Sequence, residues 1–344
     1  MNTSHNRYMQ EAVALAQQAE GMTSPNPLVG AVVVKNSKII GRGYHHQAGT
    51  PHAEVHALND AGEETGGADI YVTLEPCSTS GRTPPCTQAI IKAGIKKVFI
   101  GSLDPNPAHA GRAVEILRQA GIEVESGVET AACDALNEAF FKWITTGRPL
   151  VVLKLATTLD GRIACANGQS QWITGPEARS RVQWLRRCAD AIMVGGETVR
   201  RDHPGLVVRE PLDWPRQPRR LVASHSMSLE EAMELMAPGR TPEIIAADTP
   251  EAWNALMDRL GRDEVTELLV EGGGELAAQL LQAGVVDIAE FHIAPKILGG
   301  RGSRPAIGGE NPLSLSDAWN LEEMTYFKLG KDLIVRGRIP SREQ

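Results

Sequence analysis

The sequence predicts an α/β protein of two domains, and three observations carry this prediction. A chain of 344 residues exceeds the length of one average domain. In both halves, runs with apolar residues three and four apart alternate with short β-branched runs, which is the pattern of layered α/β folds. Between the halves, Gly147-Arg148-Pro149 forms a turn with little resemblance to a flexible linker. We therefore expect abutting domains at 1–147 and 148–344.

Composition excludes several other classes of protein. A formal net charge of −7 gives no electrostatic support to a nucleic-acid partner. No run approaches the roughly eighteen apolar residues of a membrane span, and the N-terminus lacks the pattern of a signal peptide. Five unevenly spaced cysteines favour a reducing compartment over a disulfide framework. We expect a soluble, cytoplasmic protein with a small-molecule partner and no nucleic-acid or membrane partner.

The first half shows a helix, a hairpin, and then alternating helices and strands. Helical spacing of apolar residues predicts a helix over 5–21, and the turn Pro25-Asn26-Pro27 precedes the hairpin. This order predicts a mixed sheet in an α/β domain. The further expected elements are hairpin strands at 28–34 and 39–41, a helix from 52 to about 64, a strand at 68–74, a helix from 85, strands at 98–100 and 122–124 with a helix between, and a closing helix over 129–146.

A metal-binding pattern lies in these elements. His52, Cys77 and Cys86 supply one imidazole and two thiolates, a natural tetrahedral zinc set with one position left for water. Zinc makes that water acidic, and Glu54 is spaced to pass its proton to a departing amino group as the catalytic acid–base. This arrangement is that of the zinc deaminases of nucleobases and nucleosides. A core histidine with two idle thiols is the alternative, and Pro76 and Glu54 in register speak against it.

Other histidines and cysteines fit the pattern less well. All three ligands are expected at element starts on one edge of the sheet, where open α/β folds gather their chemistry. His56 follows His52 by one helical turn, but no coordination position needs it, so we interpret it as structural or as a residue that supports the metal ligands. Three cysteines have no partner at ligand spacing and are not expected to bind zinc: Cys133, Cys165 and Cys188.

Residues 1–145 resemble the riboflavin-biosynthesis deaminases. Eight residues separate Cys77 from Cys86 where most cytidine-type deaminases have two, which favours an enzyme for a pyrimidine ribosyl phosphate. The resemblance implies a cytidine-deaminase-like three-layer fold and deamination of 2,5-diamino-6-ribosylamino-4(3H)-pyrimidinone 5′-phosphate at its C2 amino group. The motifs that carry it are Pro25-Asn26-Pro27-x-Val29-Gly30, His52-Ala53-Glu54, Thr73-Leu74-Glu75-Pro76-Cys77, Gly81-Arg82-Thr83-Pro84-Pro85-Cys86 and Asp104-Pro105-Asn106-Pro107.

The same resemblance implies substrate contacts outside the metal site. Asn26 would hydrogen-bond the ribose or the base, and Asp104 and Asn106 would line the substrate site. Asp-Pro-Asn-Pro is also a common turn sequence, which is the alternative for that segment. Arg82 would meet the substrate phosphate through its planar guanidinium, or would be a solvated loop residue.

The second half again alternates strands and helices, which predicts a mostly parallel sheet. A strand that runs into Glu271-Gly272-Gly273-Gly274 and then a helix can cradle a phosphate at the positive helix end, or can be only a tight turn. The expected strands are 150–156, 191–194, 219–223, 243–247, 266–270, 286–294 and 332–338, and the expected helices are 176–188, a short one from 198, 250–260 and 275–283.

Residues 150 to about 300 resemble the dihydrofolate-reductase-like reductase of the same pathway. The motifs are Asp160-Gly161, Ser170-x-Trp172-Ile173-Thr174, Thr198-Val199-x-x-Asp202-x-Pro204-x-Leu206 and Glu271-Gly272-Gly273. The resemblance implies NADPH-dependent reduction of the ribosyl group to a ribityl chain, with 5-amino-6-(5-phosphoribitylamino)uracil as the product. It implies cofactor contacts from Ala156, Trp172, Thr198, Asp202, Gly273 and Gly274, and substrate contacts from Ser170, Arg186, Leu206, Arg209 and Glu271.

Two positions depart from that family pattern, and two alternatives remain for the whole chain. Ala223 stands where an aspartate is usual, which leaves a cofactor contact of Ser224 open, and Arg162 stands where lysine is usual. The second domain could be a binding module without reductase activity. A nucleic-acid editor would share the zinc motif but should be basic, and the composition opposes this. Homo-oligomer formation is compatible with the sequence.

Overall fold

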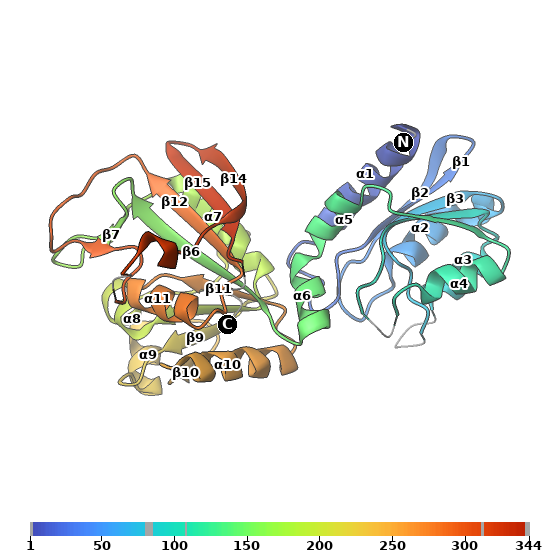
Figure 1. Ribbon diagram of the computed structural model, residues 1–344. Coiled ribbons are helices and arrows are strands. Elements are labelled where there is room, and N and C mark those ends of the chain that lie inside the picture. Colours follow the sequence, from blue (N-terminus) through green and yellow to red (C-terminus); the bar gives the residue numbers. More distant parts are fainter. Residues whose placement is uncertain (1–2, 80–84, 107–108, 311–312, 341–344) are drawn as a thin grey trace. The chain divides into compact units, whose positions relative to one another are not determined.

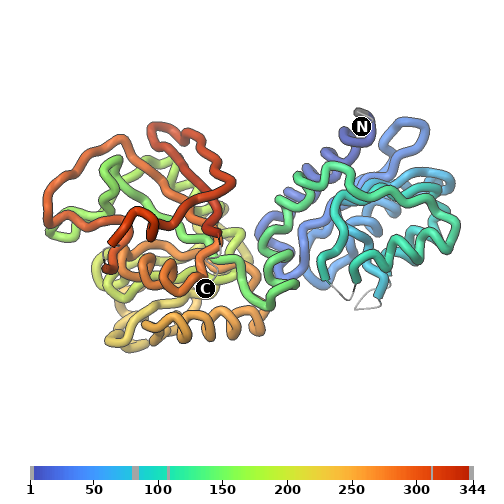
Figure 2. Tube along the Cα trace, in the orientation of Figure 1, coloured from blue at the N-terminus to red at the C-terminus, as the bar shows by residue number. Residues whose placement is uncertain are grey.

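The computed structural model describes residues 3–79, 85–106, 109–310 and 313–340. The chain divides into two compact units, Met1–Gly147 and Arg148–Gln344. Figure 2 traces the chain through each of them, with the N-terminus in the first and the C-terminus in the second. Across the described residues, no helix is both long and apolar enough to cross a membrane.

The first unit is a three-layer α/β domain around one mixed sheet (Figure 1). Its strands lie in the order β2-β1-β3-β4-β5, antiparallel on either side of β1 and parallel from β3 to β5. Its elements are α1 (Thr3–Gln17), β1 (Gly30–Lys35), β2 (Lys38–Tyr44), α2 (Ala53–Ala61), the 3₁₀ helix η1 (Gly62–Thr65), β3 (Asp69–Leu74), α3 (Cys86–Lys92), β4 (Lys97–Ser102), α4 (Arg112–Gln119), β5 (Glu123–Ser126), α5 (Thr130–Leu136) and α6 (Glu138–Thr146).

Strand alternation gives each face of this sheet its own core. Val32 and Tyr71 pack with Met9 of α1 and Cys133 of α5 on one face. The neighbouring strand residues point to the other face, where α2, α3 and α4 bury residues such as Ala57, Ile90 and Leu117. The strands β3 and β4 are buried on both sides, which is typical of parallel strands between helix layers.

The predicted closing helix over 129–146 is wrong in one respect, because it is two helices. Asn137 lies between α5 and α6 with an extended φ of −123°. Its buried side chain bonds the backbone of Leu28 twice, accepting from the N–H at 2.7 Å and donating to the carbonyl at 2.9 Å. A side chain committed to a distant backbone in this way interrupts the helix.

The second unit is built on a larger sheet in the order β10-β9-β8-β11-β6-β12-β15-β14. It is parallel from β10 to β12, and its last two strands are antiparallel. The elements are β6 (Leu150–Thr158), β7 (Arg162–Ala164), α7 (Pro176–Cys188), β8 (Ala191–Gly195), α8 (Gly196–Asp202), β9 (Arg219–Ala223), α9 (Leu229–Leu235), β10 (Glu243–Ile245), α10 (Pro250–Arg262), β11 (Glu267–Glu271), α11 (Gly274–Gln282), β12 (Ile288–Ala294), β13 (Arg304–Pro305), the 3₁₀ helix η2 (Leu315–Asp317), β14 (Glu322–Leu329) and β15 (Asp332–Arg338).

The mostly parallel sheet is confirmed, but several elements of this unit were not expected from the sequence. The core under α10 and α11 gathers Leu153, Val270, Trp253 and Leu280. Short elements were missed at β7, β13 and α9. The edge strand β14 was missed because its residues, EEMTYFKL, are almost all exposed. Without a buried face, the strand lacks the alternation of apolar and polar residues by which strands are predicted.

Candidate functional sites

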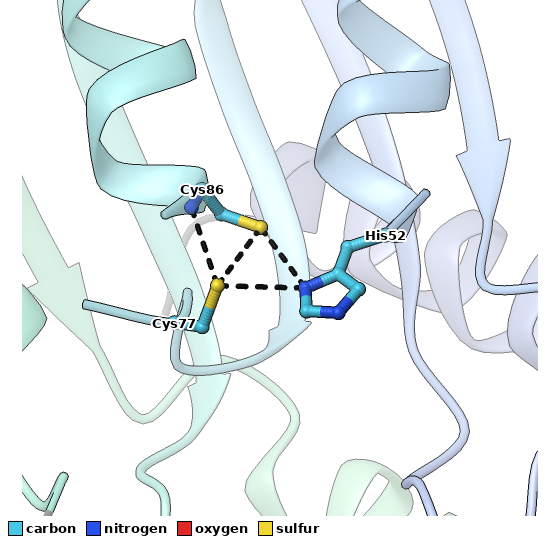
Figure 3. Close-up of side chains that lie close together, drawn as sticks. All are labelled: His52, Cys77 and Cys86. Carbon is cyan, nitrogen blue, oxygen red and sulfur yellow. Dashed lines mark hydrogen bonds between the residues drawn. The ribbon is translucent and has the colours of Figure 1, made fainter. Parts of the chain in front are cut away.

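The three predicted zinc ligands come from three segments that meet at one end of the first sheet. His52 is the N-cap residue of α2, and Cys86 is the first residue of α3. Cys77 follows the end of β3 by three residues. Figure 3 shows the imidazole and the two thiols pointing toward one another. Residues spaced far apart in sequence thus converge because helix starts and strand ends share this edge.

The distances within this cluster suit a tetrahedral metal. His52 Nδ1 lies 3.2 Å from Cys86 Sγ and 3.5 Å from Cys77 Sγ, and the two sulfurs are 3.3 Å apart. Zinc bonds of about 2.3 Å to sulfur and 2.0 Å to nitrogen place tetrahedral ligand atoms about 3.5 Å apart. Among the described residues, this is the group of three histidine, cysteine or acidic side chains close enough to hold a metal ion. The donor set therefore fits zinc.

Local hydrogen bonds prepare Cys77 for metal binding. The neighbouring Cys86 side chain lowers the pKa of Cys77, and the Cys86 backbone N–H donates to Cys77 Sγ at 3.2 Å. The same pairing of the two thiols raises the pKa of Cys86. The thiolate is the form that binds zinc.

Glu54 lies where the predicted acid–base group is needed. It occupies the first turn of α2, is 2% exposed, and its carboxyl interacts with Cys77, His52 and Cys86. Burial, followed by the charge of Cys77, raises the pKa of Glu54 above its ordinary value. His56, predicted to be structural, stacks on His46 with ring centroids 4.4 Å apart and is not part of the ligand group.

The turn that carries Asn26 is linked to the metal cluster through His45. The Asn26 amide nitrogen lies 3.1 Å from His45 Nε2, and His45 Nδ1 lies 3.2 Å from the carbonyl of Pro51. Since a carbonyl only accepts, Nδ1 carries the proton and Nε2 accepts from Asn26. The His45 ring meets the His52 ring edge-on with centroids 5.3 Å apart. Asn26 is thus held toward the cluster.

Asp104 and Asn106 form a turn at the same end of the sheet. Strands β3 and β4 are parallel neighbours with Leu74 opposite Ser102, so the segments that follow leave the sheet side by side. Asp104 Oδ1 accepts from the Asn106 N–H at 2.9 Å. This bond closes a turn, which was the alternative predicted for this segment from its sequence. The turn does not exclude a substrate contact. Arg82 and Pro107 lie outside the described residues.

In the second unit the predicted contacts surround one cleft of about 1260 Å³. The cleft lies at the ends of β8 and β11 and beside the middle of β6, between α8 and the start of α11. Its lining includes every residue expected to touch cofactor or substrate in this half: Ala156, Ser170, Trp172, Arg186, Thr198, Asp202, Leu206, Arg209, Glu271, Gly273 and Gly274.

Arg186 and Glu271 are bonded to each other inside this cleft. Arg186 Nε and Nη2 donate to the two oxygens of Glu271 at 2.6 and 2.8 Å, and Arg186 Nη1 donates to the carbonyl of Val207 at 3.1 Å. Only 7% of Arg186 is exposed, so this arginine is buried and does not lie on a solvated helix face. Burial opposes the charge on Glu271, but Arg186 outweighs it and holds the pKa of Glu271 below its usual value.

Polar contacts also order the cofactor side of the cleft. The Ser170 hydroxyl donates to Asp202 Oδ1 at 2.8 Å, which joins the loop before α7 to the end of α8. Trp172 is 63% exposed, and the Arg179 guanidinium lies 4.7 Å from its ring centroid. Gly273 has a φ of +96°, a backbone conformation that glycine permits, and it leads directly into α11.

Comparisons with known proteins match both units of the chain. Residues 2–102 match the cytidine and deoxycytidylate deaminase zinc-binding region, and residues 149–335 match the RibD C-terminal domain. The riboflavin biosynthesis protein RibD of Actinobacillus pleuropneumoniae is 42% identical over 95% of this chain and 93% of that protein. RibD of Escherichia coli is 44% identical over 85% of this chain and 88% of its own length.

Solved structures lead to the same family. RibD of Acinetobacter baumannii has a TM-score of 0.88 at 36% identity and covers 98% of this chain and 99% of its own. A Thermotoga maritima structure titled diaminohydroxyphosphoribosylaminopyrimidine deaminase/5-amino-6-(5-phosphoribosylamino)uracil reductase has a TM-score of 0.85 at 33% identity, covering 98% and 99%. The chain belongs to the RibD family.

Membership in the RibD family confirms the predicted fold class and the predicted pair of activities. The chain is a bifunctional deaminase and reductase of riboflavin biosynthesis, with a cytidine-deaminase-like domain followed by a RibD reductase domain. Zinc in the first domain and NADPH in the second are its cofactors, as expected from the sequence. The alternatives of a nucleic-acid editor and of a second domain without catalysis are therefore set aside.

Some RibD residues at the reductase cleft escaped the sequence reasoning. Lys154 lines the cleft from β6, where it is opposite Glu271 on β11 and Glu290 on β12. Burial lowers the pKa of Lys154 below its usual value. A lysine within the otherwise apolar run VVLKLA was the signal available in the sequence. Ser224 also lines the cleft, and its hydroxyl accepts from the N–H groups of Ser226 and Met227.

Proposed function

We propose that His52, Cys77 and Cys86 bind the zinc of the deaminase and that Glu54 is its acid–base group. The substrate proposed is 2,5-diamino-6-ribosylamino-4(3H)-pyrimidinone 5′-phosphate, the pyrimidine of the activity named for the Thermotoga maritima relative. The observation that carries the proposal is the convergence of the three ligand atoms beside a buried Glu54. It leaves one tetrahedral position for water.

The chain's own residues then supply the proton transfers of deamination. Zinc bound there supplies a water whose pKa is near neutral and which provides the nucleophile for the ring carbon. Glu54 takes a proton from that water and gives it to the C2 amino group, so that the C–N bond breaks and ammonia leaves. Asn26, oriented by His45, and the turn of Asp104 and Asn106 hold the pyrimidine and the ribose.

In the reductase half we propose that NADPH and the deaminated product lie together in the cleft of the second unit. NADPH supplies a hydride for C1′ of the ring-opened ribosyl group. Ala156, Trp172, Thr198, Asp202, Gly273 and Gly274 would contact the cofactor, and the bare amides at the start of α11 suit a phosphate. Ser170, Leu206 and Arg209 would bind the substrate, together with the Arg186–Glu271 pair.

Two cleft residues are positioned to move a proton to the reduced nitrogen. Asp202 is oriented by the Ser170 hydroxyl. Lys154 has a lowered pKa through burial, which makes its ammonium a better proton donor. Because Asp202 Oδ1 accepts a hydrogen bond from Ser170, we propose Lys154 as the donor of this proton.

The proposal is tested by metal analysis combined with a coupled assay on the purified chain. One zinc per chain, ammonia release, and one NADPH oxidised for each ammonia are expected. Deamination that continues after removal of zinc by a chelator would contradict the assignment of the cluster. NADPH left unoxidised after ammonia release would contradict the proposed use of the cleft.

We also propose a cytoplasmic homo-oligomer. None of the five cysteines, all of which lie in the described part of the chain, forms a disulfide, which suits a reducing compartment. The edge strand β14 exposes Met324 and Tyr326, at 54% and 76%, and an exposed apolar edge strand is a common site of association. Sedimentation of the unmodified chain tests this, since a monomer at micromolar concentration would contradict it.

A further inference from the structure

Glu75 is a buried carboxylate that takes no part in the proposed chemistry. It directly follows β3, lies two residues before Cys77, and is only 6% exposed. Its own N–H donates to the carbonyl of Ser102 at 2.9 Å, which extends the pairing of β3 with β4 by one step. A buried carboxylate is costly unless it is hydrogen-bonded, so its partners indicate what it does.

Three backbone N–H groups donate to the Glu75 carboxylate, and all belong to the segment that follows β4. Oε2 accepts from Asp104 at 3.2 Å and from Gly111 at 3.0 Å, and Oε1 accepts from Ala113 at 3.0 Å. Gly111 is the N-cap of α4 and has no side chain to satisfy the first turn. Glu75, which follows the neighbouring strand β3, supplies that cap. It thus bonds the segment near its start, at Asp104, and at its end, at Gly111 and Ala113.

This segment carries the two residues proposed to hold the pyrimidine substrate. Asp104 itself is bonded to Glu75 through its N–H, and its side chain in turn accepts from the N–H of Asn106. Because Glu75 and Cys77 are two residues apart, the carboxylate connects the turn of Asp104 and Asn106 directly to the stretch that bears a metal ligand. Bonds from N–H groups to a carboxylate are charge-assisted and directional.

We propose that Glu75 is a positioning residue of the deaminase, which fixes Asp104 and Asn106 in relation to Cys77 and thereby sets the affinity for the pyrimidine substrate. The inference rests on the proposed function and adds a residue to it that touches neither metal nor substrate. A carboxylate with only a structural role would support α4 and leave substrate affinity unchanged once the chain is folded.

The test is Glu75→Gln in the zinc-loaded full chain. Glutamine keeps the shape, but one end of its amide is a donor and cannot accept from an N–H. We expect KM for the pyrimidine substrate to rise about ten-fold while kcat changes by about two-fold or less, the pattern of lost binding. Zinc content and NADPH oxidation with the deaminated substrate should stay at their original levels. An unchanged KM would overturn the proposal, as would a loss of zinc.

Asp190→Asn is the matched control. Asp190 is also a carboxylate that accepts from backbone, in this case from the N–H groups of Thr266 and Glu267 at 2.7 and 3.2 Å, but it lies in the second unit. Its loss should leave KM for deamination unchanged. A rise equal to that of Glu75→Gln would show a general effect on folding and would contradict the positioning role.

A second measurement needs no variant. First-turn amides of a helix normally exchange with solvent quickly, because they have no partner within the helix. The amide of Ala113 lies in the first turn of α4, and those of Asp104 and Gly111 precede the helix. All three should nevertheless exchange slowly in the unmodified chain, and fast exchange at all three contradicts the proposal. An unmodified chain that releases no ammonia contradicts the proposed function instead, so the two failures are distinguishable.

Discussion

The zinc cluster and the reductase cleft differ in how their residues are distributed and in what else those residues do. The cluster draws its ligands from the stretch between His52 and Cys86: two lie at helix starts, and Cys77 follows β3 by three residues. The cleft draws its lining from 154 to 308. A metal site depends on a few strong bonds of fixed geometry, whereas the cleft depends on many contacts. Some of those, such as Arg186 with Glu271, are also part of the buried interior.

This difference predicts that substitutions at the cluster damage chemistry alone, while substitutions in the cleft damage chemistry and stability together. The sharpest effect is expected for Cys86→Ala. Two ligands do not hold zinc at full occupancy, so the variant should lose its metal and all measurable deamination, and it should still oxidise NADPH with the deaminated substrate. Metal analysis of Cys165→Ala, which changes a cysteine outside the cluster, is the control. Full zinc content in Cys86→Ala would contradict the ligand set.

Glu54→Gln separates proton transfer from metal binding within the same cluster. The amide has the shape of the carboxyl but does not shuttle protons, so deamination should fall at least about a hundred-fold with zinc retained. Ammonia release at substrate saturation measures this. Near-normal release would mean that another group carries the protons.

Glu271→Gln tests the cleft side of the comparison. The substitution leaves the buried Arg186 charge without its counter-ion, which should lower the free energy of unfolding of the second unit by about 3 kcal/mol and weaken reduction. Glu11→Gln removes an ion pair with Arg42 whose side chains are 41% and 49% exposed, and it should cost less than about 1 kcal/mol. Urea unfolding followed by tryptophan fluorescence suits this measurement. An equal loss of unfolding free energy in Glu271→Gln and Glu11→Gln would contradict the structural role assigned to the Arg186–Glu271 pair.

A smaller effect, on the pH dependence of stability, is expected at Glu290, which lies on β12 opposite Lys154. Burial opposes its charge, but hydrogen bonds from His292 and Arg181 outweigh burial and hold the pKa of Glu290 well below its usual value. A carboxyl whose pKa is lower in the folded chain than in the unfolded chain stabilises the fold at any pH above its unfolded pKa of about 4.3. This stabilisation is lost as the pH falls from the unfolded pKa toward the folded pKa. The second unit should therefore lose stability below about pH 4.3, and Glu290→Gln should flatten that loss. If the free energy of unfolding of Glu290→Gln fell with pH as steeply as that of the unmodified chain, the role of Glu290 would be contradicted.

The two regions also differ in how far the sequence predicted them. The convergence of His52, Cys77 and Cys86, with Glu54 buried in the first turn of α2, could be predicted because a metal-binding pattern is a short run of chemically distinctive residues. The cleft residues came from a resemblance rather than from physical reasoning, since serine, arginine and glycine have many other uses.

The features that the sequence did not reveal are mostly hydrogen bonds and ion pairs between residues far apart in the chain. The bond from Asn137 to Leu28, the Arg186–Glu271 pair and the three donors of Glu75 join residues that no local period connects. The exposed strand β14 was missed for the related reason that its pairing with β15, and not burial, makes it a strand.

The central claim is that each unit carries its own chemical site. The most direct test gives the full-length Glu54→Gln chain the already deaminated pyrimidine together with NADPH, and follows loss of NADPH absorbance. NADPH oxidation at the rate of the unmodified chain is predicted, because Glu54 lies in the first unit and every proposed cofactor contact lies in the second. A variant that binds zinc and is folded but does not oxidise NADPH would contradict the claim.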